Sequence, residues 1–160
     1  MKKKLEKLLT SLKTKKLTIA LAESCTAGYA SYLLTKTPGA SRVFKGSTIV
    51  YSLDAKNKLF KIGPSLLRKT QGVSSEIALI LAKEARKKFN ADIGASIVGF
   101  AGPQVKKGVK AGTVFIALSY KSGSTIEKVI IKGNRDMVRK KASSFLVNLI
   151  YERFANSNID

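Results

Sequence analysis

Histidine and tryptophan are absent from this 160-residue chain, and cysteine occurs once, as Cys25. Without histidine no imidazole can activate a serine or cysteine nucleophile, so every Ser-His and Cys-His arrangement is excluded. A single cysteine cannot form an intramolecular disulfide, and the usual zinc ligand sets cannot be assembled without histidine. The sequence therefore predicts no structural metal, and any catalytic base must be Lys, Tyr, Asp or Glu.

Acidic residues are also scarce, because 10 Asp and Glu face 30 Lys and Arg, which leaves a net charge of +20 and a pI near 10.2. Such a charge attracts phosphates and raises the hypothesis of a nucleic-acid partner. However, the basic residues run through every segment, and none of the standard nucleic-acid-binding motif spacings occurs. We therefore do not expect a nucleic-acid partner, and the charge equally suits an anionic small substrate.

Long apolar runs and flexible linkers are missing as well. Mean hydropathy is +0.00, and every apolar run stops well short of the roughly 18 residues that span a bilayer. No repeat or low-complexity linker divides the chain, so one domain over residues 1–160 is expected. In residues 1–16, leucines recur at helical spacing between lysines, which predicts an amphipathic helix instead of a signal peptide, and hence a cytoplasmic protein with no membrane partner.

What is present is an alternation of strand and helix patterns. Strands are expected within residues 15–23 and over 43–51, 93–98, 112–120 and 124–132, and helices over about 26–36 and 52–62, after the N-cap Ser74, and after the N-cap Asn134. The last two strands are joined by a Ser-Gly turn, which predicts a hairpin. This order indicates an α/β fold, a three-layer α/β/α sandwich with a mixed sheet.

The stretch "AESCTAG", residues 22–28, follows the first strand and places a serine, a cysteine and a threonine side by side. Ser24 is expected where a strand leads into a helix, so unpaired N–H groups of the first turn can face a phosphate or an oxyanion there. The alternative is that Ser24 only caps the helix. Cys25 is not expected to be a nucleophile, because no histidine can activate it.

A second candidate stretch is "YSLDAK", in which Tyr51 ends a strand and Lys56 lies in the following helix. Both can project toward the same end of the sheet as Ser24. A lysine acts as general base only if burial or neighbouring positive charge lowers its pKa from about 10.4 toward neutrality. The alternatives are a solvated Lys56 and a Tyr51 that serves packing alone.

The loop "GFAGP", Gly99–Pro103, also follows a strand, and its glycines permit close approach of the backbone to a ligand. Ligands of open α/β sheets collect outside the carboxyl ends of the strands, so this loop and the Ser24 turn can face each other. Arg135, at the start of the last helix, is a candidate for gripping an anion, although a solvated surface arginine is an equal alternative.

Taken together, "AESCTAG", "YSLDAK", "VSSEIA", "ADIGASIVGFAGP", "AGTVFIAL" and "GNRD" make the chain resemble the CinA C-terminal domain family, the nicotinamide mononucleotide amidases, over nearly its full length. The resemblance implies a three-layer α/β/α sandwich with a mixed, mostly parallel five-stranded sheet. It implies hydrolysis of nicotinamide mononucleotide to nicotinate mononucleotide and ammonia, with no metal or organic cofactor. The family's catalytic residues fall on Ser24, Tyr51 and Lys56, and the residues expected to bind substrate are Cys25, Thr26, Gly28, Gly99, Ala101, Gly102 and Arg135.

The chain departs from the family pattern in three places. Val98 stands where the family usually has threonine, Gln104-Val105 replaces a glycine pair, and Ala27 replaces a glycine. Val98 lacks a hydroxyl that could bond substrate, and Gln104-Val105 adds bulk. The alternative function is therefore a non-catalytic or altered-specificity nucleotide-binding module of the same fold. The amphipathic first helix and the strand edges also leave room for a homodimer.

Overall fold

A computed structural model of the chain describes residues 1–103 and 109–156, so Gln104-Val105 lies outside the described residues. In the described residues the strands are β1 (Ile19–Glu23), β2 (Phe44–Ile49), β3 (Ile93–Gly99), β4 (Thr113–Tyr120) and β5 (Gly123–Ile130). The helices are α1 (Lys2–Thr14), α2 (Tyr29–Thr35), α3 (Leu53–Phe60), α4 (Pro64–Thr70), α5 (Ser75–Lys88) and α6 (Arg135–Phe154), with a short 3-10 turn η1 (Ala40–Arg42).

Within the described ranges the five strands form one mixed sheet in the order β2-β1-β3-β4-β5. β1 pairs in parallel with both β2 and β3, whereas β4 pairs antiparallel with β3 and β5. Parallel and antiparallel ladders are thus equal in number there, although only β4 runs against the common direction. The predicted mixed sheet and the β4–β5 hairpin are confirmed.

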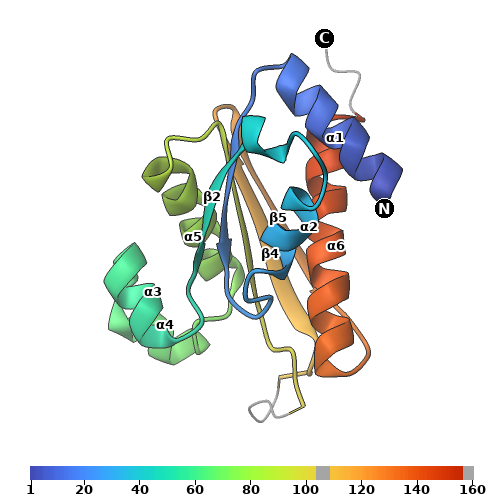
Figure 1. The fold of residues 1–160 in the computed structure, drawn as a ribbon. Helices are drawn as coiled ribbons and strands as arrows, with labels where there is room; N and C mark the ends of the chain where they lie inside the picture. Colours follow the sequence, from blue (N-terminus) through green and yellow to red (C-terminus); the bar gives the residue numbers. More distant parts are fainter. Residues whose placement is uncertain (104–108, 157–160) are drawn as a thin grey trace.

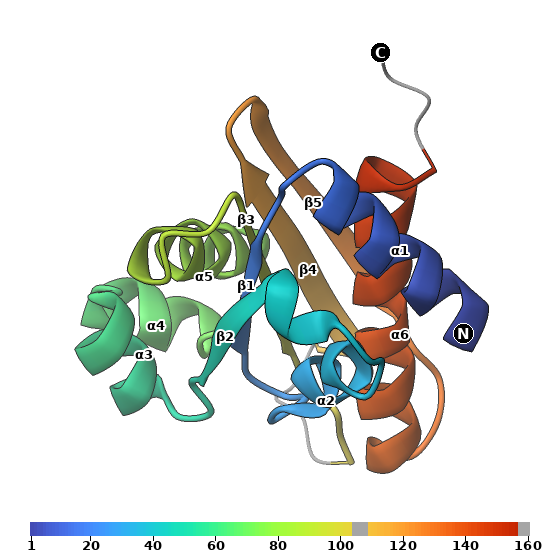
Figure 2. The same ribbon diagram turned by 45° about the horizontal axis from the view of Figure 1, so that its top comes forward.

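Helices cover both faces of the sheet, as Figures 1 and 2 show from two directions. α1, α2 and α6 lie on one face, and α3, α4 and α5 lie on the other, which confirms the three-layer sandwich. Side chains of a strand point alternately to the two faces. In β3, for example, Ile93, Ala95 and Ile97 pack toward α6, whereas Ser96 donates to the Ala78 carbonyl of α5 at 2.6 Å.

Most expected elements occur close to their predicted places. α1 buries Leu5, Leu8, Leu9 and Leu12, as the spacing predicts. Ser74 and Asn134 cap α5 and α6 by accepting hydrogen bonds from Ile77 N–H and Met137 N–H.

Two predictions of local structure are wrong. The helix expected from residue 26 begins only at Tyr29, because Ala27 and Gly28 adopt left-handed conformations at φ 48° and 93°. Residues 64–70 form α4, a helix that was not expected, although the preceding helix α3 does end before Gly63-Pro64 as predicted. The proline instead occupies the first turn of α4, where its missing N–H removes no helical hydrogen bond.

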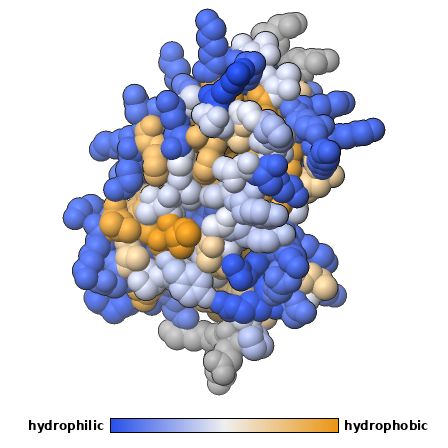
Figure 3. All heavy atoms as spheres, in the orientation of Figure 1, coloured by the Kyte–Doolittle hydropathy of each residue, from blue (hydrophilic) through white to orange (hydrophobic). Residues whose placement is uncertain are grey.

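Within residues 1–103 and 109–156, no helix has both the length and the apolar character needed to cross a membrane. Hydrophilic side chains project around most of the outline of the face drawn in Figure 3. This distribution agrees with basic residues that run through every segment of the chain.

Candidate active site

The candidate site lies at the carboxyl ends of the three parallel strands, at the lower end of the molecule in Figure 1. After β1 the chain passes through α2 on one face of the sheet, and after β2 it passes through α3, α4 and α5 on the other. Connections that leave neighbouring parallel strands toward opposite faces open a crevice between the strand ends. The topology therefore creates a hollow beside the end of β1.

A cavity of about 330 Å³ occupies this hollow. Six residues predicted for the site line it, namely Ser24, Cys25, Tyr51, Lys56, Gly99 and Arg135. Five lining residues that were not predicted are Ser52, Leu53, Gln71, Val73 and Phe100. The cavity thus gathers residues from five separate stretches of the chain.

Ser24 and Lys56 meet in this cavity. Lys56 Nζ donates to Ser24 Oγ at 3.1 Å and to the Val50 carbonyl at 3.0 Å. Lys56 lies in the first turn of α3, which Ser52 caps by accepting a hydrogen bond from Ala55 N–H. The helix start therefore fixes the lysine opposite the serine.

Lys56 is only 2% exposed, and no carboxylate of the described residues pairs with it. The acidic residue of its own helix, Asp54, pairs with Lys58 at 2.9 Å instead. Burial disfavours the charged ammonium and lowers the pKa of Lys56 to about 8, while the nearby Cys25 thiol opposes this shift. A lysine with this pKa can exchange a proton with a serine near neutral pH.

The alternative in which Ser24 caps the helix is wrong, because Glu23 accepts the hydrogen bonds of the first turn. The fully buried Glu23 carboxylate accepts hydrogen bonds from the N–H groups of Gly28, Ala30 and Ser31. It also accepts from the hydroxyls of Thr26 and Ser31. These bonds fix the turn that carries Ser24, and they give the first N–H groups of α2 an acceptor. The Ser24 hydroxyl is therefore not needed as a cap and bonds Lys56 instead.

Cys25 is adjacent to Ser24, and its surroundings disfavour the thiolate form. Burial raises the pKa of its thiol to about 12, more than its own backbone N–H and Lys56 lower it. Thiolates, and not thiols, are the nucleophilic form of cysteine. The expectation that Cys25 is not the nucleophile therefore agrees with its surroundings.

Tyr51 lines the cavity, but its hydroxyl makes no hydrogen bond to Ser24 or Lys56. The tyrosine is 55% exposed, and its hydroxyl accepts a hydrogen bond from Arg135. Arg135 also donates to the Gly102 carbonyl at 2.8 Å. Arg135 thus ties the end of β2 to the glycine-containing loop across the mouth of the cavity.

The glycines of this end have different physical roles. A Cβ at Gly99 would lie 2.7 Å from the Thr113 carbonyl oxygen, so this glycine serves the close approach of β4 as well as the cavity. At Gly72, where φ is +70°, a Cβ would lie 2.6 Å from Leu53 and 3.2 Å from Lys56 Cδ. Gly72 therefore leaves the space that the lysine side chain fills.

Four residues predicted to bind substrate do not line the cavity. Thr26 bonds Glu23, Gly28 takes a left-handed conformation, Ala101 is buried, and Gly102 supplies a carbonyl to Arg135. Thr26 and Gly102 thus contact residues next to the cavity or in its lining, and do not line it themselves.

Val98 does not line the cavity. It packs in the apolar cluster of the α5 face and is fully buried, so its missing hydroxyl does not alter the cavity wall.

The unpredicted lining residues come mainly from the segment after α4 and from Phe100. Gln71 and Val73 were missed because α4 itself was not expected, so nothing placed the following turn at the strand ends. Phe100 lies in the predicted "GFAGP" loop, and its apolar side chain in that loop was the sequence feature that could have identified it as a lining residue. No group of three Cys, Asp or Glu side chains suited to a metal ion occurs in the part of the chain that the structure describes.

Comparison with known proteins gives a consistent family. The sequence pattern described as CinA C-terminal domain matches residues 1–154. A CinA-like protein of Geobacter metallireducens is 39% identical over 124 residues, which cover 77% of this chain and 30% of that protein. The chain spans about one third of the length of the curated relatives it matches.

Solved structures match over nearly the whole fold. The competence or damage-inducible protein of Enterobacter asburiae superposes with a TM-score of 0.91 at 27% identity, covering 96% of this chain and 97% of that one. Competence damage-inducible protein A of Klebsiella pneumoniae gives a TM-score of 0.91 at 21% identity, with 96% of each chain covered. The second similarity concerns the fold alone.

Proposed function

The chain belongs to the CinA C-terminal domain family, and on this premise we propose that it is an amidohydrolase that converts nicotinamide mononucleotide to nicotinate mononucleotide and ammonia. The observation that carries the proposal is the buried contact of 3.1 Å between Lys56 Nζ and Ser24 Oγ in a chain without histidine. A buried lysine with a lowered pKa is the base that such a chain has available for a serine nucleophile.

In the first half of the reaction, neutral Lys56 takes the proton of Ser24, and Ser24 Oγ forms a bond to the carboxamide carbon. The resulting tetrahedral intermediate carries a negative oxygen. The backbone N–H groups of Cys25 and Thr26 follow the nucleophile directly and are candidates to stabilise that oxygen, each donor being worth about 3 kcal/mol. The Thr26 N–H makes no hydrogen bond to another described residue.

Breakage of the carbon–nitrogen bond then releases ammonia, which receives the proton held by Lys56. Tyr51 can assist at the mouth of the cavity. Because its oxygen accepts a hydrogen bond from Arg135, its own phenolic proton remains available to the substrate amide.

In the second half, a water molecule attacks the acyl ester, and Lys56 takes a proton from that water. The bond to Ser24 Oγ breaks, and the serine regains its proton from Lys56. Nicotinate mononucleotide leaves, and the enzyme returns to its starting protonation state. The cycle consumes one water and needs no metal or organic cofactor.

An adjoining cavity supports a substrate that carries a phosphate. It has a volume of about 530 Å³, shares Gln71, Val73 and Phe100 with the Ser24 cavity, and is lined by the lysines Lys69, Lys110 and Lys128. The reacting amide can occupy the first cavity while the phosphate meets ammonium groups in the second.

The proposal is tested by incubating the purified protein with nicotinamide mononucleotide and measuring ammonia, with a Ser24→Ala variant as control. Release above the control supports the amidase. Calorimetry on the same samples tests the alternative, a nucleotide-binding module without turnover. Binding without ammonia release would replace the amidase with that module, and the absence of both would exclude each of them.

A further inference from the structure

A second cationic cavity lies at the opposite end of the sheet from Ser24, at the upper end of Figure 1. It has a volume of about 550 Å³ and lies between the last turns of α5 and the β4–β5 hairpin. Basic residues from both elements line it, namely Lys83, Arg86, Lys87 and Lys121. We call this cavity the hairpin groove. It shares no lining residue with the Ser24 cavity.

The floor of the hairpin groove is made of small polar residues. Ser119 pairs with Gly94 on β3 and with Ser124 on β5, so these three residues lie side by side on the α5 face of the sheet. A Cβ at Gly94 would lie only 2.0 Å from the Ala82 carbonyl oxygen, so α5 packs directly on β3 there. The groove opens beside that contact, above Ser119 and Ser124.

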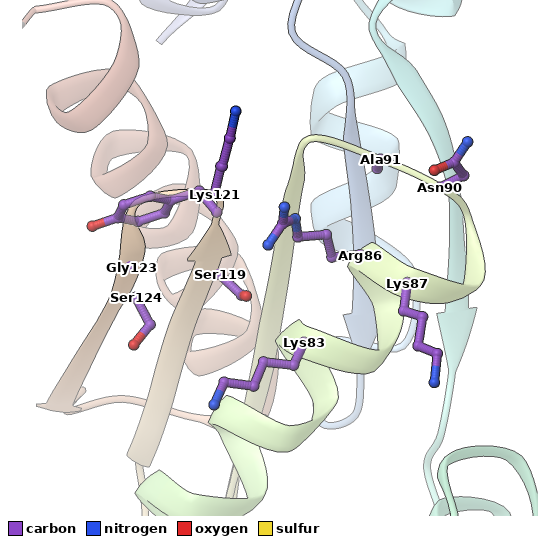
Figure 4. Close-up of a pocket in the computed structure, with 10 residues that line it drawn as sticks. Lys83, Arg86, Lys87, Asn90, Ala91, Ser119, Lys121, Gly123 and Ser124 are labelled. Atoms are coloured by element: carbon purple, nitrogen blue, oxygen red, sulfur yellow. The ribbon is translucent and has the colours of Figure 1, made fainter.

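Ser119 points to a ligand because its hydroxyl has no protein partner. Its side chain is only 4% exposed, yet it makes no hydrogen bond with any described residue. Figure 4 shows the hydroxyl directed toward α5, with Arg86 and Lys83 reaching from the helix toward the hairpin. A hydroxyl that lines a cationic cavity and has no protein partner can donate to an incoming acceptor.

The four cations also lack partners. None of their side chains forms a salt bridge or hydrogen bond among residues 1–103 and 109–156. The acidic group with an electrostatic effect from Arg86 is Asp92, whose Oδ2 accepts hydrogen bonds from the N–H and the hydroxyl of Thr18. Lys83, Arg86 and Lys87 share one helix face at i, i+3 and i+4, where like charges repel. A multivalent anion would relieve that repulsion.

The charge and the lining select the ligand class. One phosphate monoester carries about −1.5 to −2 charges, so the four cations of the lining, of which Lys83 and Arg86 reach toward the hairpin, match a ligand with at least two phosphates. The aromatic residue of the lining, Tyr120, has its ring packed on Phe154 at 5.5 Å and under Arg153 at 4.9 Å. Single-stranded nucleic acids depend on free aromatic faces for stacking. We propose that the hairpin groove binds a small polyphosphate anion.

The test is calorimetric titration of the full chain with inorganic triphosphate at low ionic strength. We expect binding that weakens at least roughly tenfold in Lys83→Gln/Arg86→Met, because two charge-assisted contacts are lost. Methionine keeps the aliphatic stem near Gly94, so the variant retains that packing. A matched control, Lys2→Gln/Lys3→Gln, removes the same charge from exposed positions of α1 and should change affinity by less than about twofold.

Two further measurements locate the ligand. Amide resonances of Ser119 and Ser124 should shift on titration while that of Phe100 does not, and Ser119→Val should weaken binding by filling the floor. Equal weakening in the two double variants would reduce the interaction to general electrostatics and overturn the proposal. So would the absence of binding, shifts confined to Phe100, or a mixed-sequence oligonucleotide that binds more tightly than triphosphate at the same salt.

Discussion

Glu23 and Lys56 are both buried ionisable residues on either side of the Ser24 position, yet the protein treats their charges oppositely. Glu23 is fully buried and accepts five hydrogen bonds from N–H and hydroxyl donors. Lys56 is 2% exposed and donates only to one hydroxyl and one carbonyl, with no carboxylate beside it. The protein thus provides the Glu23 carboxylate with hydrogen-bond donors on both oxygens, whereas it provides the Lys56 amine with only two neutral acceptors.

The alternation of a strand explains how neighbouring residues come to serve these two environments. Glu23 ends β1 and turns toward α2, while the next residue, Ser24, turns toward α3 on the other face. A buried charge whose hydrogen bonds are satisfied stabilises the fold, whereas a buried ammonium with few partners tends to lose its proton. The carboxylate side therefore holds the turn, and the lysine side is suited to chemistry.

The largest expected effect comes from removing the lysine amine. Lys56→Met should lower turnover of nicotinamide mononucleotide at least about 100-fold, since general base catalysis commonly contributes that much. Steady-state ammonia release by the variant measures this, with circular dichroism to verify folding. Near-normal turnover in a folded variant would show that Lys56 is not the base.

Replacing Glu23 and replacing Lys56 should change the free energy of unfolding in opposite directions. Glu23→Gln should reduce the free energy of unfolding by about 2–4 kcal/mol, because the amide NH₂ would face donors that the carboxylate now satisfies. Lys56→Met should instead stabilise by about 1–2 kcal/mol at pH 7, because burying the ammonium is costly. Urea denaturation of both variants checks this. Two losses of similar size would mean that the lysine is as well satisfied as the carboxylate.

The pH dependence of activity should follow the lysine. With a pKa of about 8, its neutral fraction rises from about one tenth at pH 7 to about nine tenths at pH 9. Turnover should therefore increase about tenfold over this interval. Stability should rise with pH between about 8 and 10.5, because the unfolded chain then binds the proton that folded Lys56 has lost. A flat profile from pH 7 to 9 would contradict the assignment.

The smallest effect should come from crowding the lysine. Gly72→Ala places a methyl against Leu53 and Lys56 at a positive φ, and should lower turnover roughly fivefold by displacing the amine. Gly39→Ala is the matched control, since it also has a positive φ but has nothing within 4 Å of its Cβ. Equal kinetics of the two variants would mean that the packing at Gly72 does not position Lys56.

Much of the fold follows from local pattern. Apolar alternation located every strand of the described sheet, and cap residues located the starts of α5 and α6. α4 was not predicted because Gly63-Pro64 is typical of a break between elements. A proline is, however, also compatible with the first turn of a helix, and Pro64 lies there. The late start of α2 was not predicted, because the left-handed conformations of Ala27 and Gly28 accompany the hydrogen bonds of this turn to the buried Glu23 carboxylate.

The sequence by itself determined the chemical inventory: a serine, a lysine, no histidine, and a family pattern that joins them. Only the tertiary structure decided which lysine is buried, that Tyr51 bonds Arg135 instead of Ser24 or Lys56, and that Glu23 caps α2. The physical reason is that a pKa depends on the water and charge around a group. Those surroundings come from segments far apart in the chain, and they exist only when the sheet has formed.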